Sequence, residues 1–282
     1  MGIEIGARTD VGRVRHNNED SYRLVLELNL FALSDGMGGE AHGEVASGMA
    51  VQTVAAHCLE AANNPSAPFF GELQPDLSEK TNRLASAAHL ANPKIHNAAR
   101  TNPAQQGMGA TLLAAWLDGQ RLSLVHVGDS RAYLLRAGAL EQLTRDHSLV
   151  AEQVRQGLIT PQQAEASEMQ SVLIRALGTQ EEIEADADEH LLLDGDTLLL
   201  CSDGLTRMVT DPEIASTLLT HPAAQAAADR LVALANEYGG EDNVTVVVLP
   251  VTLGSEGLLG RLRRWSRSLR GSADARPSSG GR

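Results

Sequence analysis

The hydrophobic pattern divides the chain into short runs that predict strands and longer Ala-rich stretches that predict helices. Strand-like runs lie at 3–7, 22–26, 30–33, 110–117, 121–127, 131–136, 182–193, 196–202 and 244–251. Helical stretches lie at about 43–61, 77–100, 211–219 and 223–238, and a proline-rich loop covers 63–76. Because strands come in consecutive runs and helices are inserted as pairs, this order predicts an α+β layered domain and not alternating βαβ units.

Composition excludes several classes of function. The 282 residues are 43% hydrophobic and 21% charged, which suffices for a buried core and argues against a disordered chain. A net charge of −13 repels a phosphate backbone, and 3% aromatic residues provide no stacking platform, so we expect no nucleic-acid partner. Two distant cysteines, a polar N-terminus and the lack of an 18-residue apolar run predict a cytoplasmic protein that does not span a membrane.

The charge is uneven along the chain. Residues 253–282 carry seven arginines against two acidic residues, a net charge of +5, which leaves −18 on the remainder. One helical stripe in this tail collects its large apolar residues, Leu258, Leu262, Trp265 and Leu269. We therefore predict a domain at 1–252, followed by a basic amphipathic segment and a disordered end at 253–282. The candidate partners of this tail are an anionic membrane, which would place the protein peripherally, an acidic protein or its own acidic body.

Four aspartates share one placement, at or beside the end of an apolar strand and in a glycine-containing turn: Asp35, Asp129, Asp203 and Asp242. Each alone is compatible with an ordinary Asp-Gly turn. Four on an acidic chain indicate a site, because clustered carboxylates repel one another unless cations neutralise them. Oxygen ligands without a Cys/His set favour Mg²⁺ or Mn²⁺ over Zn²⁺.

A basic segment precedes the first of these aspartates. It runs from Gly12 to Asp20 and contains Arg15. A guanidinium beside a metal cluster is a common partner of a phosphoryl group, because its fork matches two oxygens. Taken alone, the segment is equally compatible with a solvated loop.

In chain order, these pieces resemble the metal-dependent Ser/Thr protein phosphatases of the PPM, or protein phosphatase 2C, type, in a bacterial form. Each motif is weak by itself, whereas six in the family order are specific, and they span 1–251. The motifs are Arg15 with Asn18-Glu19-Asp20, Ser34-Asp35-Gly36-Met37-Gly38-Gly39, Gly109-Ala110-Thr111, Val127-Gly128-Asp129-Ser130-Arg131, Cys201-Ser202-Asp203-Gly204-Leu205 and Glu241-Asp242-Asn243-Val244-Thr245.

The resemblance implies a four-layer αββα sandwich, in which two antiparallel sheets are flanked by helix pairs and a metal cleft lies at one edge. The segment 146–180 corresponds to the variable flap beside this cleft, and we expect it to contribute to substrate choice and to the affinity for a third metal.

The resemblance also implies metal ligands. Asp35 would bridge two Mn²⁺ or Mg²⁺ ions, and Asp203 and Asp242 would complete the shell of the first ion. The Gly36 carbonyl and Glu19, through water, would serve the second ion.

Further roles follow from the same resemblance. Asp129 would bind a third, weaker ion together with Asp203, and Arg15 would hold the substrate phosphate. Asp20 would orient a ligand or water from behind the metal ligands.

These roles imply hydrolysis of phosphoserine and phosphothreonine in proteins by a water activated between two ions, without a protein nucleophile. The ions and Arg15 would stabilise the developing negative charge. The substrates would be phosphorylated proteins, and the enzyme would oppose Ser/Thr kinases in bacterial signal transduction.

The chain departs from the family at the proton donor. Many relatives have a histidine shortly after the bridging aspartate, whereas Met37 and Glu40 stand there in this chain, and the nearest histidine is His42. His42 is a candidate general acid, with a metal-bound water as the alternative. The plainer interpretation of His42 is a polar residue at the start of a helix.

Two other functions compete with this hypothesis. Residues Cys201 to Arg207 match C-x-x-G-x-x-R, the phosphate loop of cysteine-based phosphatases. However, Leu200 replaces the usual preceding histidine, and Asp203 inside the loop would repel phosphate. The other alternative is a non-catalytic regulatory domain with the same fold, which the complete set of aspartates disfavours.

Overall fold

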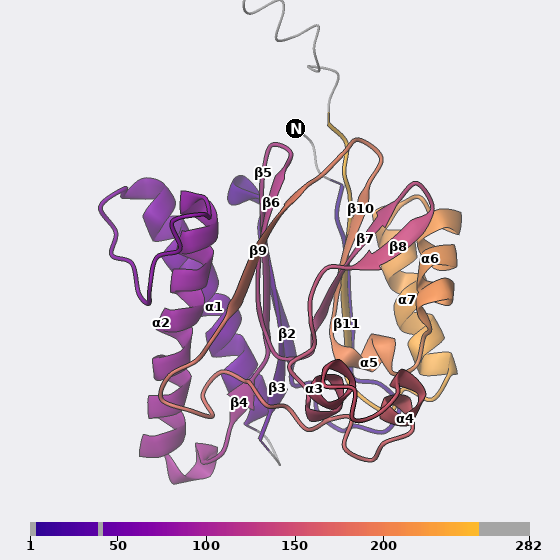
Figure 1. The fold of residues 1–282 in the computed structure, drawn as a ribbon, viewed down its shortest axis with the longest axis horizontal. Coiled ribbons are helices and arrows are strands. Elements are labelled where there is room, and N and C mark those ends of the chain that lie inside the picture. The colour runs from indigo at the N-terminus through magenta and orange to yellow at the C-terminus, as the bar shows by residue number, and fades with distance from the viewer. Residues whose placement is uncertain (1–3, 39–41, 254–282) are drawn as a thin grey trace, which may run out of the picture.

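The computed structural model describes residues 4–38 and 42–253, and these form two β-sheets between two layers of helices (Figure 1). One sheet has the strand order β1-β11-β10-β7-β8, and the other has the order β2-β3-β5-β6-β9 with β4 paired to β3. The strand pairs of both sheets are antiparallel. The arrangement confirms the predicted α+β class and the four-layer αββα sandwich.

Most strands lie at or close to the predicted runs, whereas no strand was predicted at Ala139–Gln142. The first sheet consists of β1 (Gly6–Asp10), β7 (Arg131–Arg136), β8 (Ala139–Gln142), β10 (Thr197–Cys201) and β11 (Val244–Pro250). The second consists of β2 (Asp20–Val25), β3 (Leu30–Met37), β4 (Gly109–Ala110), β5 (Leu112–Asp118), β6 (Arg121–Val127) and β9 (Asp186–Leu191).

Two predicted strands were wrong in extent. The run at 3–7 becomes β1 at Gly6–Asp10, because pairing with Val244–Val248 of β11 sets its limits, not its own apolar residues. The run at 182–193 contributes only β9, which pairs with β6 from Arg121 to His126.

Four long helices cover the outer faces of the sheets (Figure 1). Helices α1 (Gly43–Asn63) and α2 (Glu79–Thr101) pack on the second sheet, and α6 (Asp211–Thr220) and α7 (Ala224–Glu237) pack on the first. The Ser78 side chain caps α2, and the Thr210 and Glu213 side chains form a capping box on α6, which explains where both helices begin.

Three apolar clusters hold the layers together. Two lie between a sheet and its helices, and the third lies between the sheets. Strand β10 shows the division: Leu198 and Leu200 face the opposite sheet, whereas Leu199 and Cys201 face the helices. Both faces of the strand are therefore buried, which explains its continuous apolar sequence.

The segment 146–180 contains two short helices, α3 (Leu149–Arg155) and α4 (Pro161–Glu165). A single bridge between Ser148 and Leu173 joins two parts of this segment, and a second bridge, between Leu177 and Ala110, attaches its C-terminal end to the body. A third short helix, α5 (Asp203–Thr206), follows β10, and short 3₁₀ turns lie at Leu26–Leu28 and Pro103–Gln105.

The predicted basic tail falls almost entirely outside the described residues, since only Leu253 of it is described. Within 4–38 and 42–253, the structure contains no helix with the length and apolar character needed to cross a membrane. The division into a domain and a tail stays a prediction.

Candidate metal centre

One cleft of about 650 Å³ collects most of the predicted site residues. It lies where strand ends and turns of both sheets meet, since its lining includes β3, the β6–β7 turn, the first residue of α5 just after β10 and the turn before β11. The predicted residues that line it are Arg15, Glu19, Asp35, Gly36, Asp129, Asp203 and Asp242. The structure thus brings together residues that lie up to 227 positions apart in the sequence.

Asp35 is held through its backbone by Thr111. The Asp35 N–H donates to Thr111 Oγ1 at 2.8 Å, and the Thr111 N–H donates to the Asp35 carbonyl at 2.8 Å. Thr111 Oγ1 also shares a 2.8 Å hydrogen bond with Ser130 Oγ, beside Asp129. One threonine therefore fixes two acidic turns relative to each other, a role that its motif marked but sequence reasoning did not assign.

Two glycines permit close backbone approach in the cleft. A Cβ on Gly36 would lie 2.0 Å from the carbonyl oxygen of Gly43 in the first turn of α1. A Cβ on Gly204 would lie 2.0 Å from the carbonyl oxygen of Asn243. Each contact is shorter than any side chain tolerates, so glycine is required for the packing itself.

Asn243 attaches the N-terminal segment to the cleft. Its Nδ2 donates to the carbonyls of Val11 at 2.9 Å and Asn17 at 2.8 Å, and its Oδ1 accepts from the Glu19 N–H at 2.8 Å. These bonds place Arg15 and Glu19 beside Asp242. The sequence motif contains Asn243, but nothing in its local pattern revealed this function.

Asp20 lies buried opposite Asp35 in the β2–β3 register. Its Oδ2 accepts from Ser202 Oγ at 2.8 Å and from Thr245 Oγ1 at 2.6 Å. Its Oδ1 is buried and has no hydrogen-bond partner among the described residues. Burial raises the pKa of Asp20 to about 7.

The other carboxyl groups experience the same environment. Burial raises the pKa of Asp129 to about 8, and burial with the nearby charges of Asp20 and Asp203 raises the pKa of Asp35 well above its ordinary value. Burial also raises the pKa of Asp203, against the opposing effect of Arg207, and its Oδ1 lacks a hydrogen-bond partner within the described structure. Crowded carboxylates with orphaned oxygens match the all-oxygen donor set of Mg²⁺ or Mn²⁺, so the residues present fit such ions.

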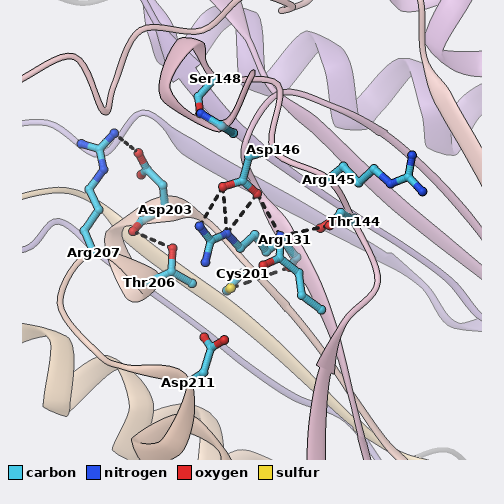
Figure 2. Close-up of polar contacts among 12 residues, drawn as sticks. Arg131, Thr144, Arg145, Asp146, Ser148, Cys201, Asp203, Thr206, Arg207 and Asp211 are labelled. Carbon is cyan, nitrogen blue, oxygen red and sulfur yellow. Dashed lines mark hydrogen bonds and ion pairs between the residues drawn. The ribbon is translucent and has the colours of Figure 1, made fainter. Parts of the chain in front are cut away.

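Two arginines supply positive charge in this cleft. Arg15 Nη2 lies 2.9 Å from Asp242 Oδ2. Arg207, which follows α5, places Nη2 2.5 Å from Asp203 Oδ2 and Nη1 3.8 Å from Asp242 Oδ2. Figure 2 shows Arg207 directed at Asp203. The sequence predicted Arg15 for this place and did not predict Arg207 as a partner of the acidic cluster.

A third arginine, Arg131, forms an ion pair with Asp146 at the beginning of the flap. Arg131 donates to the Asp146 carboxylate from Nε at 3.0 and 3.1 Å and from Nη2 at 2.7 Å (Figure 2). Its Nη1 donates to Tyr133 Oη at 2.9 Å. The forked contact fixes the segment that carries Asp146 against β7 and next to Asp129.

A second group of potential ligands was not predicted. His126, His147 and Asp186 place ligand atoms within 4.8 Å of one another. Arg175 Nη1 lies 2.9 Å from Asp186 Oδ1, so a guanidinium already balances the carboxylate. His147 Nδ1 accepts from the Gly128 N–H at 3.2 Å. We interpret the group as an ion-pair cluster that joins the flap to β9.

His42 and Cys201 lie elsewhere. His42 directly precedes the first residue of α1 and does not line the cleft, so its role as a general acid stays a prediction. Cys201 is fully buried, and burial raises its pKa to about 12. A thiolate nucleophile is strongly disfavoured there, which removes the physical basis for the cysteine-phosphatase alternative.

Comparison with known proteins agrees with this geometry. A family model described as Protein phosphatase 2C matches residues 13–241. The chain is 41% identical to the serine/threonine protein phosphatase PstP of Mycobacterium tuberculosis over 249 residues, which cover 88% of this chain and 45% of PstP. It is 38% identical to the serine/threonine phosphatase stp of Listeria monocytogenes over 253 residues, which cover 89% of this chain and 96% of stp. The chain thus spans less than half the length of PstP.

Solved structures show the same fold. A crystal structure of the M. tuberculosis phosphatase PstP/Ppp superposes with a TM-score of 0.77 at 39% identity, over 89% of this chain and 99% of that one. A structure of the PstP catalytic domain in complex with two manganese ions gives 0.74 at 40% identity, over 89% and 98% of the two chains.

Proposed function

Since this chain belongs to the protein phosphatase 2C family, we propose that it hydrolyses phosphoserine and phosphothreonine in proteins with the help of divalent cations. One observation carries the proposal: four aspartates from separate strand ends line one cleft together with Arg15. The names of its bacterial relatives as Ser/Thr phosphatases support the class of substrate.

We propose Mn²⁺ or Mg²⁺ as the cofactor, as two ions and a third, weaker one. Asp35, Asp203 and Asp242 would hold the pair with the Gly36 carbonyl and with Glu19 through water. Asp129 would serve the third ion. The manganese complex of the related PstP catalytic domain supports this assignment. Such ions, when bound, supply a Lewis acid and a water of lowered pKa that can attack phosphorus.

The chain's own residues perform the remaining tasks. Arg15 would bind two oxygens of the phosphate, and Asn243 holds the segment that carries Arg15 in place. Thr111 fixes the backbone of Asp35. Asp20 accepts two hydroxyl hydrogen bonds through Oδ2, and its buried Oδ1 has no partner among the described residues, so this oxygen would orient a ligand or water.

His42 is our candidate for protonating the leaving alkoxide. The residue lies at the start of α1, directly before Gly43, which packs against the Gly36 carbon and the Glu19 carboxylate. We expect the His42→Ala variant to lose the limb of the pH–rate profile that a general acid produces. An unchanged profile would assign proton donation to another group, with a metal-bound water as the candidate.

The biological setting belongs to the same proposal. We propose that the enzyme acts on phosphorylated proteins in a bacterial cytoplasm and opposes Ser/Thr kinases in signal transduction. Its two cysteines are unpaired and buried, which suits a reducing compartment.

We further propose that the basic residues at 253–282 attach the protein to an anionic membrane. The measurement is co-sedimentation of the full chain with anionic vesicles, compared with a chain that ends at residue 252. Equal co-sedimentation of the two would reject the membrane and leave an acidic protein or the chain's own acidic body as the partner of the tail.

The central experiment measures hydrolysis of a phosphothreonine peptide by the full chain with Mn²⁺, after chelation, and after Mn²⁺ is restored. We expect chelation to abolish hydrolysis reversibly. The Asp203→Asn variant should lose more than about 100-fold in rate, because a proposed metal ligand is weakened. Asp229→Asn, at an exposed position of α7, is the matched control and should retain activity. No hydrolysis by the Mn²⁺-loaded wild type would favour a non-catalytic regulatory domain.

A further inference from the structure

Arg207 occupies an unusual position in the acidic cleft. Its Nη2 lies 2.5 Å from Asp203 Oδ2, and its Nη1 lies 3.8 Å from Asp242 Oδ2. Arg15 lies in the N-terminal segment, and its Nη2 is 2.9 Å from the same Asp242 oxygen. Two guanidinium groups thus converge on one carboxylate oxygen, and both line the cleft.

The backbone of Arg207 is fixed beside Asp203. The Arg207 N–H donates to the Asp203 carbonyl at 2.9 Å, so the residue is held one turn after Asp203, directly behind the last residue of α5. The side chain is 25% exposed, compared with 53% for Arg15. Its charge is permanent, because a guanidinium does not lose its proton in proteins. The cleft therefore contains a permanent positive charge from Arg207 in addition to that of Arg15.

The partners of Arg207 are carboxylates that the proposed function assigns to divalent cations. A carboxylate that binds a dication attracts a guanidinium much less, and the dication repels the guanidinium directly. Binding of ions at Asp203 and Asp242 would therefore deprive Arg207 and Arg15 of their anionic partners together. A phosphate group in the cleft would replace the lost partners, since its oxygens match the guanidinium fork.

We propose that Arg207 is a second phosphate-binding residue, which exchanges the carboxylates of Asp203 and Asp242 for the phosphate of the substrate when cations bind. The inference rests on the proposed function and adds a residue to it. Arg207 would couple the binding of cations to the binding of phosphate. Without phosphate, its guanidinium competes with the cations for the carboxylates. With phosphate present, it favours the state in which both cations and phosphate are bound. Because such coupling is reciprocal, cation and phosphate binding should strengthen each other through this residue.

The test compares the wild type with Arg207→Ala and Arg207→Lys in the full chain. Calorimetry measures Mn²⁺ binding without phosphate, and inhibition of hydrolysis measures the affinity for inorganic phosphate at saturating Mn²⁺. We expect Arg207→Ala to bind Mn²⁺ about tenfold more tightly and phosphate about tenfold more weakly. Arg207→Lys should keep the Mn²⁺ affinity of the wild type but recover only part of the phosphate affinity, because an ammonium lacks the fork.

The opposite changes expected for the Mn²⁺ affinity and the phosphate affinity distinguish this role from a purely structural one. If Arg207→Ala weakens both ligands, the residue merely stabilises the cleft, and the proposal is overturned. Unchanged affinities for both ligands overturn it as well. Arg230→Ala, which removes an exposed ion pair of α7, is the control for the loss of one positive charge and should shift neither affinity.

The outcome also distinguishes this inference from the proposed function. A wild type that binds Mn²⁺ and hydrolyses the phosphopeptide, with an Arg207→Ala variant that shifts neither affinity, refutes the role of Arg207 alone. A wild type that neither binds Mn²⁺ nor hydrolyses the peptide refutes the proposed function, and the role of Arg207 with it.

Discussion

At the scale of single residues, neutral hydrogen-bonding groups position the acidic ones. Thr111 binds the backbone of Asp35 and the hydroxyl of Ser130, and Asn243 binds three backbone groups of the N-terminal segment. A hydroxyl or amide can satisfy buried backbone groups without adding charge to an already crowded cluster. The neutral residues around the acidic motifs therefore determine where the aspartates lie in the cleft.

Burial decides the chemistry of Cys201. We expect iodoacetamide at pH 8 to leave Cys201 of the native protein unmodified and the phosphopeptide hydrolysis unchanged, because burial raises the thiol pKa to about 12. Mass spectrometry of the treated protein measures the modification. Protein unfolded in urea is the control, in which both cysteines should react. Rapid inactivation with alkylated Cys201 would restore the thiol mechanism as a candidate.

At the scale of elements, the close packing of β3 on α1 shapes one side of the cleft. Strand β3 carries Asp35 and Gly36 into the site, and the first residues of α1 lie directly against Gly36. The prediction of a strand followed by an Ala-rich helix came from sequence periodicity. The contact between them follows from packing, because apolar residues of β3 and α1 belong to one buried cluster.

Replacing either of two glycines near this contact by alanine should change the free energy of unfolding, but in opposite directions. Gly36→Ala should lower the free energy of unfolding by about 1–3 kcal/mol, because its Cβ would collide with the Gly43 carbonyl. Gly48→Ala, inside α1, meets only Ser21 Oγ at 4.0 Å and should raise it by about 0.5–1 kcal/mol. Urea denaturation of the metal-free proteins measures both. Equal effects of the two substitutions would mean that the close approach does not exist in solution.

The junction of the flap with β9 should contribute to acid stability. A hydrogen bond from His147 lowers the pKa of Asp186 to about 2 from its ordinary value of 3.8. A carboxyl group with a lowered pKa stabilises the fold above its unfolded pKa and loses this effect as pH falls through the folded pKa. Asp186→Asn should therefore destabilise the protein at pH 6, by an amount that shrinks toward pH 3. Urea denaturation across this range is the measurement, and a constant difference would contradict the expectation.

At the scale of the whole molecule, the layer between the two sheets joins the halves of the cleft. This layer contains Leu124 of β6 and Leu200 of β10, which are 1% and 0% exposed. Because Asp129 follows β6 and Asp203 follows β10, the packing of this core sets the separation of the two carboxylates. Local contacts at the site could not maintain that separation by themselves.

Truncation in this inter-sheet core should be costly. Leu200→Ala should lower the free energy of unfolding by about 2–5 kcal/mol, since it removes buried methyl groups and leaves a cavity. Leu219→Ala on α6, where the side chain is 56% exposed, is the matched control and should change it by less than about 0.5 kcal/mol. Urea denaturation followed by circular dichroism compares the two variants. Similar small effects would show that the sheets do not depend on each other.

Periodicity and turn chemistry are local properties, so they were sufficient to predict most of the elements and the acidic strand ends, although β8 was missed. Asp203 stands two residues after the continuous apolar run of β10, and the burial of the strand on both faces is encoded in that run. The pattern failed for β1, whose limits depend on a partner strand more than 230 residues away. Such pairing leaves little trace in the local sequence.

The amino-acid order alone dictated which carboxylates stand at strand ends, since glycine turns and apolar alternation act over a few residues. The tertiary structure decided that they meet in one cleft, that Asp20 lies behind them and that Arg207 shares their charge with Arg15. It also decided the raised pKa values of Asp35 and Asp129, because burial and proximity exist only after the two sheets have packed. Distances between remote segments are set by packing, and the chemistry of this site depends on those distances.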